Sequence, residues 1–193
     1  MSRAKGPSQR DEGAFPRAGR SEIGYRIDRV EAFLARARES YDQTNSVRAR
    51  VTSAEIRRTA FPVARRGYSA RFVDAAMDRL EEVFYERERR DRIQQIGEDG
   101  WWAETGQLLR EVRGRIERPR GKRFSRRGIF ATGYRRSQVD AFLDRVLALF
   151  AGTEGLTTSD VRTVVFHSEW RGYNEDEVDA LLDAVIELLL ATR

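Results

Sequence analysis

One short pattern occurs four times in the chain: Gly-Tyr, four further residues, then a valine, an acidic residue and an alanine. The copies are GYRIDRVEAFL (24–34), GYSARFVDAAM (67–77), GYRRSQVDAFL (133–143) and GYNEDEVDALL (172–182). Four matches in a chain of 193 residues are not a chance event. A single repeat of this kind does not bury its apolar face alone, so we expect the copies to pack on one another.

Four positions of the motif recur in every copy. They are Gly24, Tyr25, Val30 and Glu31; Gly67, Tyr68, Val73 and Asp74; Gly133, Tyr134, Val139 and Asp140; and Gly172, Tyr173, Val178 and Asp179. We expect the glycine to supply a backbone angle that other residues avoid, and the tyrosine to pack at a hairpin corner. The acidic residue suits the first turn of a helix, where the helix dipole favours negative charge. No second carboxylate, histidine or phosphate-binding loop accompanies it, so the motif is predicted to be structural.

The copies are of two kinds in alternating order, A (copies one and three) and B (copies two and four). Copies one and three have a phenylalanine nine residues before the glycine (Phe15 and Phe124), whereas copies two and four have one six residues before it (Phe61 and Phe166). This order indicates tandem duplication of a block of two copies. The predicted segments are a disordered arm (1–14), a first repeat pair (15–96), a helix and linker (97–123) and a second repeat pair (124–193).

Each copy leads into an amphipathic helix. In copy three the apolar residues from Val139 to Phe150 recur at i, i+3, i+4 and i+7, and the other copies follow the same spacing. A shorter helix is predicted before copies two and four (51–61 and 156–166), with serine or threonine as the N-cap. The sequence therefore predicts an all-α fold of short helical hairpins and amphipathic helices in tandem repeats, with limited coiled-coil-like pairing.

The segment between the two blocks carries several structure breakers. Gly97 and Gly100 are predicted to end the preceding helix, and one more amphipathic helix is expected over 108–116. The following PRGKR (119–123) is interpreted as an exposed linker.

The composition excludes several classes of function. There are no cysteines, and His167 is the only histidine, which excludes disulfide scaffolds, thiolate sites and histidine-pair zinc sites. The chain is predicted not to be an enzyme, and no catalytic, cofactor or metal site is expected. No apolar run approaches the roughly 20 residues that span a bilayer, and the first residues lack an apolar signal core, so a cytoplasmic location is predicted.

The charge leaves one alternative open. Basic residues number 36 and acidic residues 31, for a net charge of +5, and only Lys5 and Lys122 are lysines. A basic protein can bind nucleic acid or anionic lipid, but here the acidic residues alternate with the basic ones along the helices. A nucleic-acid-associated protein is the second functional hypothesis, and no known nucleic-acid motif supports it.

Copies two and four resemble the N-terminal domain of the DivIVA family of bacterial polar and septal scaffolds. The resemblance rests on LTTSDVRTVVFHSEWRGYNEDEVDALLDAVIELL (156–189) and on VTSAEIRRTAF (51–61) with RRGYSARFVDAAMDRL (65–80). Copies one and three match only from Gly-Tyr into the helix, and the likeness covers about three quarters of the chain. The chain is therefore similar to an actinobacterial DivIVA-domain repeat protein.

This resemblance implies a protein that binds the cytoplasmic membrane, at poles or septum, and recruits partners in growth or division. In the family, an aromatic residue and an arginine just before Gly-Tyr insert into the bilayer. These positions are Trp170 and Arg171 in copy four, and Arg65 and Arg66 in copy two, which keeps the cations without the aromatic. Copies one and three do not match at these positions.

One departure from the family concerns assembly. Scaffold members continue into long heptad coiled coils, which this sequence lacks, so the resemblance does not extend to filament formation. The duplication suggests the hypothesis that the two B copies pair within one chain as a pseudo-dimer.

Three local alternatives stay open. Trp170 with Arg171 is either a membrane anchor or a tryptophan packed beneath the turn with a solvated arginine. Trp101 and Trp102 contact lipid or a partner, or else form a seam between the blocks, which is favoured. The run RERRDR (87–92) either contacts phosphates or is a solvated helix face with internal ion pairs, which is also favoured.

Overall fold

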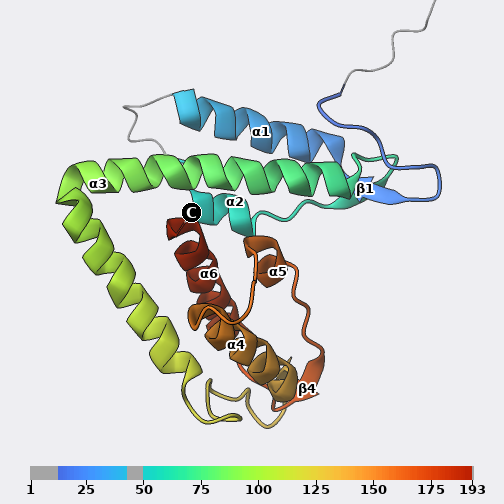
Figure 1. Ribbon diagram of the computed structural model, residues 1–193. Coiled ribbons are helices and arrows are strands. Elements are labelled where there is room, and N and C mark those ends of the chain that lie inside the picture. The colour runs from blue at the N-terminus through green and yellow to red at the C-terminus, as the bar shows by residue number, and fades with distance from the viewer. Residues whose placement is uncertain (1–12, 43–49, 193) are drawn as a thin grey trace, which may run out of the picture. The chain divides into compact units, whose positions relative to one another are not determined.

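The computed structural model describes residues 13–42 and 50–192, and in these ranges the chain is mostly helical (Figure 1). The elements are β1 (Ile23–Tyr25), α1 (Ile27–Asp42), α2 (Ser53–Arg58), β2 (Val63–Arg65), α3 (Ala70–Ile116), β3 (Thr132–Tyr134), α4 (Arg136–Phe150), α5 (Thr158–Arg162), β4 (Ser168–Trp170) and α6 (Glu175–Ala191). A largely all-helical class is confirmed, and the structure adds four short strands that the sequence does not predict. The expected disordered arm (1–14) lies almost wholly outside the described residues.

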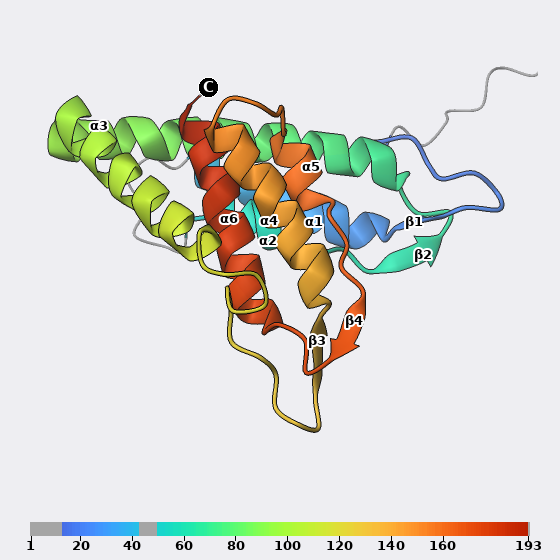
Figure 2. The same ribbon diagram turned by 60° about the horizontal axis from the view of Figure 1, so that its bottom comes forward.

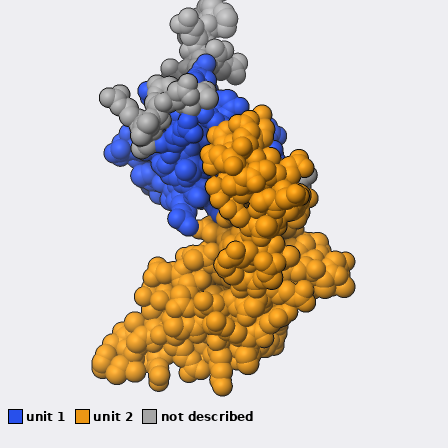
Figure 3. Space-filling view, turned by 90° about the vertical axis from the view of Figure 1, so that its left-hand side faces the viewer, with its two compact units in different colours: residues 1–88 blue, residues 89–193 orange. Residues whose placement is uncertain are grey.

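The chain forms two compact units, unit 1 (1–88) and unit 2 (89–193), shown in different colours in Figure 3. Helix α3 contributes residues to both. Its path is interrupted at Gly97, whose φ of 76° and ψ of 167° are not helical. The predicted break at Gly97 is confirmed, but the one at Gly100 is wrong. Gly100 continues the helix, because an isolated glycine costs a helix only about 1 kcal/mol.

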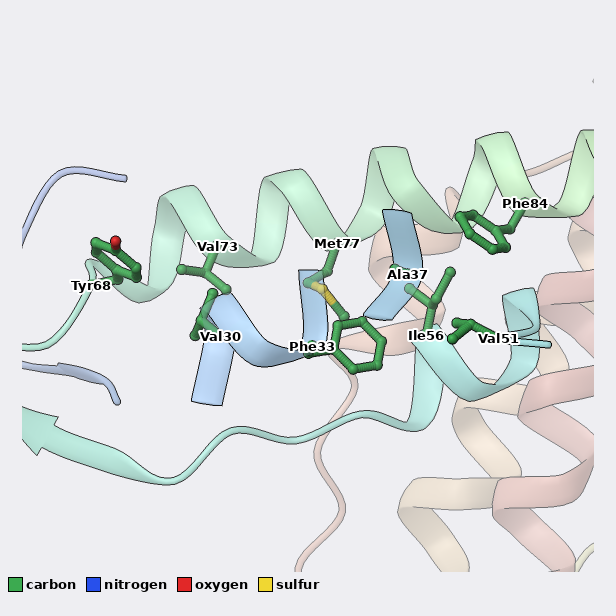
Figure 4. Close-up of a cluster of buried hydrophobic side chains, with 9 residues drawn as sticks. All are labelled: Val30, Phe33, Ala37, Val51, Ile56, Tyr68, Val73, Met77 and Phe84. Carbon is green, nitrogen blue, oxygen red and sulfur yellow. The ribbon is translucent and has the colours of Figure 1, made fainter. Parts of the chain in front are cut away.

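The core of unit 1 is an apolar cluster drawn from three helices (Figure 4). Helix α1 supplies Val30, Phe33 and Ala37, which lie on one stripe because they are three and seven residues apart. The other buried members are Val51, Ile56, Tyr68, Val73, Met77 and Phe84. The predicted amphipathic faces of copies one and two therefore meet in one core.

In unit 2 the amphipathic faces of α4 and α6 supply most of the buried side chains. Those of α4 include Val139, Phe142, Leu143 and Val146; those of α6 include Val178, Leu181, Leu182, Val185 and Ile186. Helix α5 packs against α6, with Val161 buried. The second half of α3 adds Val112 and Ile116, which confirms the amphipathic helix expected there.

Helices α2 and α5 end before the predicted short helices do. Their N-caps are confirmed: Thr52 and Thr157 each accept a hydrogen bond from the backbone N–H three residues on, at 3.0 and 3.1 Å. At the other end, Pro62 disfavours helical backbone at Phe61, and the β-branched run 163–165 favours an extended chain. Each helix is therefore followed by an extended segment that reaches a strand.

The strands join neighbouring copies of the motif. β1 pairs antiparallel with β2, and β3 with β4. At the last residue of β1, Tyr25 exchanges two backbone hydrogen bonds of 2.8 and 2.9 Å with Tyr68, and at the end of β3, Tyr134 exchanges two of 3.0 and 2.9 Å with Tyr173. Within each unit, the strand partner of the B copy is therefore the A copy and not the second B copy of the pseudo-dimer hypothesis.

Close backbone approach explains the motif glycines. A Cβ on Gly24 would lie 2.2 Å from the carbonyl oxygen of Tyr68, and one on Gly133 would lie 2.1 Å from that of Tyr173. The glycines of copies two and four are equally confined, with corresponding distances of 2.3 and 2.5 Å. No side chain fits at such distances, so only glycine lets the two backbones meet.

The expectation that these glycines supply an unusual backbone angle is wrong. Among the described glycines, positive φ occurs at Gly97, Gly121 and Gly152 only. In copies two and four the left-handed residue is the arginine just before the glycine, with φ of 57° at Arg66 and 52° at Arg171. That conformation is uncommon for a residue with a side chain.

Replacing Gly133 by alanine is expected to destabilise unit 2 by about 3 kcal/mol, because the new methyl group overlaps the Tyr173 backbone. Gly155→Ala is the matched control, since a Cβ there meets no atom within 4 Å and its φ is not positive. Denaturant unfolding followed by circular dichroism measures both. Equal stability of the two variants would show that the backbones are not in contact.

Candidate functional site

The motif tyrosine of each copy forms a hydrogen bond with the motif acidic residue of the paired copy. The four pairs are Tyr68 with Glu31, Tyr25 with Asp74, Tyr173 with Asp140, and Tyr134 with Asp179. The hydroxyl of Tyr173, for example, donates to Asp140 Oδ1 at 3.0 Å in the buried core. The expectation that the acidic residue lies in the first turn of its helix is wrong, since Asp140, for example, follows the first turn of α4. The acidic position serves instead as a cross-copy hydrogen-bond acceptor.

These contacts change the ionisation of the tyrosines. Burial raises the pKa of Tyr25, Tyr68, Tyr134 and Tyr173 above the ordinary value, because it penalises the phenolate. The neighbouring carboxylate raises each pKa further, through its charge and by accepting the hydroxyl proton. All four tyrosines are therefore held as neutral hydrogen-bond donors.

A buried arginine fixes the chain that enters unit 2 before β3. Arg123 Nη1 donates to the backbone oxygen of Asp140 at 2.7 Å, and Nη2 donates to Asp144 Oδ1 at 2.5 Å. Burial raises the pKa of Asp144, but hydrogen bonds from Arg123 and Arg120 outweigh it and leave that pKa below its usual value. The prediction of an exposed linker over 119–123 is wrong at Arg123, which is only 4% exposed.

Unit 2 carries an exposed group that we name the apolar tip: Ile129 and Phe130 from the loop between Arg123 and β3, with Trp170 and Arg171 at the end of β4. Figure 2 shows this loop running beyond the ends of β3 and β4. A turn closes it, with the N–H of Ala131 donating to the Gly128 oxygen at 3.0 Å. The N–H of Arg171 donates to the Ala131 oxygen at 3.1 Å, so the loop of copy three lies beside the strand end of copy four.

Three large apolar side chains of the apolar tip face solvent. Phe130 is 88% exposed, Trp170 60% and Ile129 58%. Trp170 is therefore not packed beneath the turn, which was one of the two interpretations left open. Ile129 and Phe130 were missed because copies one and three lack the family pattern just before Gly-Tyr. The sequence feature that could have identified them is a pair of consecutive apolar residues inside the loop sequence RRGIFATGY (126–134).

The charged residues around the apolar tip differ in whether they have an ion-pair partner among the described residues. Glu169 accepts hydrogen bonds from the backbone and side chain of Arg136 at 3.0 and 3.3 Å, and the backbone bond is the main reason why its pKa is lowered. Arg127 contacts Glu175 and Asp176 at 3.4 and 3.5 Å. Arg171 is exposed and forms no ion pair within the described part of the chain. The apolar tip thus combines apolar side chains with an uncompensated cation.

Unit 1 has a different surface at the corresponding place, which we name the arginine ribbon: Ile23, Val63, Arg65 and Arg66. The predicted pair Arg65 and Arg66 lies at the end of β2, and both are exposed. Ile23 and Val63, on β1 and β2, are each 64% exposed. Tyr25, which is paired with Val63, shares this face but is half-buried, so the exposed side chains named here include no aromatic ring.

The other sequence candidates do not form a site. Trp101 is buried and Trp102 is half exposed, and within unit 2 Trp102 borders a cavity of about 370 Å³ with Leu109, Leu149 and Phe150. The run 87–92 is engaged by the protein itself: Arg87 donates to the Tyr41 oxygen at 2.8 Å, and Arg92 pairs with Glu104. Over residues 13–42 and 50–192, no group of three or more histidine, cysteine or acidic residues is arranged to hold a metal ion.

Comparison of the chain with protein-family models, with curated proteins and with solved structures found no match. None of the described helices combines the length and the apolar character that crossing a bilayer requires.

The raised tyrosine pKa values predict a loss of stability at high pH. A group whose folded pKa lies above its unfolded value of 10.0 contributes stability below that pH and loses it as the pH rises through the folded pKa. We expect the free energy of unfolding to fall above about pH 10, with the phenolate absorbance of these tyrosines appearing only as the protein unfolds. The variant Tyr68→Phe/Tyr173→Phe should lose less stability over this range. Tyrosines that all ionise near pH 10 in the folded protein would contradict the buried pairs.

Proposed function

We propose that the chain is a non-catalytic, DivIVA-like scaffold protein of cell division or polar growth. It lies in the cytoplasm at the inner face of the membrane, at poles or septum, and holds protein partners through its helices. The observation that carries the proposal is the apolar tip, where Ile129, Phe130 and Trp170 face solvent beside Arg171, which has no ion-pair partner among the described residues.

The proposed contact lies at the interface between lipid and water. Burying one large apolar side chain is worth about 1.5–3 kcal/mol, and a cation near an anionic bilayer adds about 1 kcal/mol. Tryptophan suits this depth because its ring is apolar and its N–H is polar. Three such side chains and one arginine give a reversible peripheral contact and not a permanent anchor.

The pairing of copies supports the family proposal in a modified form. We propose that each unit is a duplicated A–B module in which two copies of one chain replace the two subunits of a dimer. The reciprocal backbone bonds of the motif tyrosines occur in both units and support this. Helix-mediated partner binding is supported by the half-exposed Trp102 and the exposed Leu109 on α3, which border an apolar cavity in unit 2.

Co-sedimentation with vesicles of phosphatidylglycerol and phosphatidylcholine tests the membrane contact. Trp170→Ala and Phe130→Ala should each weaken binding by about tenfold or more, because each removes one inserting side chain. Trp102→Ala is the control: it removes an exposed tryptophan outside the apolar tip and should leave binding unchanged. Wild-type protein that stays in the supernatant at low salt, or tip variants that bind like the control, would reject the proposal.

A further inference from the structure

An open cavity of about 370 Å³ lies within unit 2, between the second half of α3 and the last turns of α4 and α6. One side is formed by α3, where Trp102, Gly106 and Leu109 are four and three residues apart and therefore share a stripe. Phe150 of α4 and Leu189 of α6 belong to the other walls. The volume falls in the range of small-molecule sites, which runs from about 300 to 1,000 Å³.

The helix ends at the cavity satisfy their own polar groups. The hydroxyl of Thr192 donates to the backbone oxygens of Leu188 and Leu189 at 3.2 and 3.3 Å. At the end of α4, the oxygen of Leu149 accepts a hydrogen bond from the N–H of Gly152 at 2.9 Å. These groups need no partner from a ligand, so a hydrocarbon suits the cavity.

The cavity leaves apolar surface in contact with water. Trp102 is 51% exposed and Leu109 37%, so a hydrocarbon that enters between the helices would bury both side chains further. A methylene group is about as large as a water molecule, whose share of the liquid volume is about 30 Å³. The cavity therefore has room for roughly a dozen carbon atoms, which is one hydrocarbon chain and not two.

A cation stands at the rim of the cavity. Gly106 lines the cavity, and a Cβ on it would lie 3.5 Å from Arg110 Nη1, so the guanidinium lies beside the opening. Arg110 is exposed and forms no ion pair or side-chain hydrogen bond within the ranges that the structure describes. Its neighbours three and four positions away on α3 include no acidic residue; they are Gly106, Gln107, Arg113 and Gly114. An anionic group at this rim would meet a cation that the protein does not neutralise.

Gly106 keeps this side of the cavity open. It lies inside a helix, where glycine is less favourable than any other residue except proline. Packing does not require glycine here, because a Cβ would meet only Arg110 within 4 Å, at an ordinary contact distance. The space that the missing side chain leaves belongs to the cavity.

We propose that this cavity binds a single-chain anionic amphiphile of the fatty-acid class, with its hydrocarbon between α3, α4 and α6 and its carboxylate at Arg110. The apolar walls and the volume specify one hydrocarbon chain, and Arg110 specifies the charge of the head group. The inference goes beyond the proposed function, because it involves neither the apolar tip nor a bilayer.

Calorimetric titration of the full chain with dodecanoate tests the head group. We expect a Kd in the micromolar range, and binding at least about tenfold weaker for dodecyltrimethylammonium, which has the same chain and the opposite charge. Arg110→Gln should weaken dodecanoate binding by about fivefold and leave the binding of uncharged dodecanol unchanged. Arg113→Gln is the matched control on the same helix, because Arg113 already pairs with Glu117 at 2.7 Å. Equal affinities of the Arg110 and Arg113 variants for dodecanoate would overturn the proposed head-group contact.

Filling the cavity tests the site of the hydrocarbon. Gly106→Leu should weaken dodecanoate binding by about tenfold or more, because the new side chain takes the space of the ligand. Gly114→Leu is the control, since it lies on the same helix, a Cβ there meets no atom within 4 Å, and it does not line the cavity. Both variants should melt at or above the wild-type temperature, because leucine favours a helix more than glycine does. A Gly106→Leu variant that binds like the control would overturn the proposal.

Quenching of tryptophan fluorescence by chain-brominated dodecanoate locates the ligand. Quenching should be largely lost in Trp102→Phe and kept in Trp170→Phe. The opposite pattern would place the amphiphile at the apolar tip and overturn the proposal. A wild type that neither releases heat nor is quenched at millimolar dodecanoate also rejects it, and leaves the cavity to a partner helix. Vesicle binding depends on the apolar tip, so its result stands apart from all of these outcomes.

Discussion

Two backbone hydrogen bonds between the motif tyrosines hold each unit together, and the rest of the structure depends on them. Tyr134 and Tyr173 exchange these bonds in unit 2, as Tyr25 and Tyr68 do in unit 1. Such short contacts require that the residue before each tyrosine has no side chain, since a Cβ on Gly133 would lie 2.1 Å from the opposite carbonyl oxygen. The motif glycines therefore determine which two segments of the backbone can come into contact.

This backbone contact determines where the motif side chains and the neighbouring loops lie. Once the backbones meet, each tyrosine hydroxyl reaches the motif acidic residue in the helix of the other copy, as Tyr173 reaches Asp140. The arginine before the glycine then takes a left-handed conformation with its side chain exposed, as at Arg171. In unit 2 the same pairing brings the loop of copy three beside the strand end of copy four. The apolar tip is therefore composite, since neither copy alone carries Phe130 and Trp170.

The helices followed from the sequence, whereas the strands and the contacts between copies did not. Apolar spacing and threonine caps predict the helices because they act within one or two turns, as at Thr52 and Thr157. The role of Gly133 could not be derived from the sequence. A positive φ and a close backbone approach both require glycine, and the sequence does not show which of the two applies. The choice of an A copy as the partner of a B copy is a long-range pairing, and helical periodicity carries no information about it.

The candidate site was predicted only in part for the same reason. Trp170 and Arg171 lie next to the motif, so their position before Gly-Tyr identified them. Ile129 and Phe130 matter only because another copy places Trp170 beside them, and that neighbourhood is not visible in the sequence. The burial of Arg123 likewise depends on Asp140 and Asp144, which lie on a helix later in the chain.

Amide hydrogen exchange of the motif tyrosines is the most direct test of pairing within one chain. Pairing within one chain predicts that the N–H groups of Tyr25, Tyr68, Tyr134 and Tyr173 exchange slowly, at rates that do not depend on protein concentration. Rapid exchange at these four positions, or protection that is lost on dilution, would show that the copies do not pair within a single chain and would contradict the account.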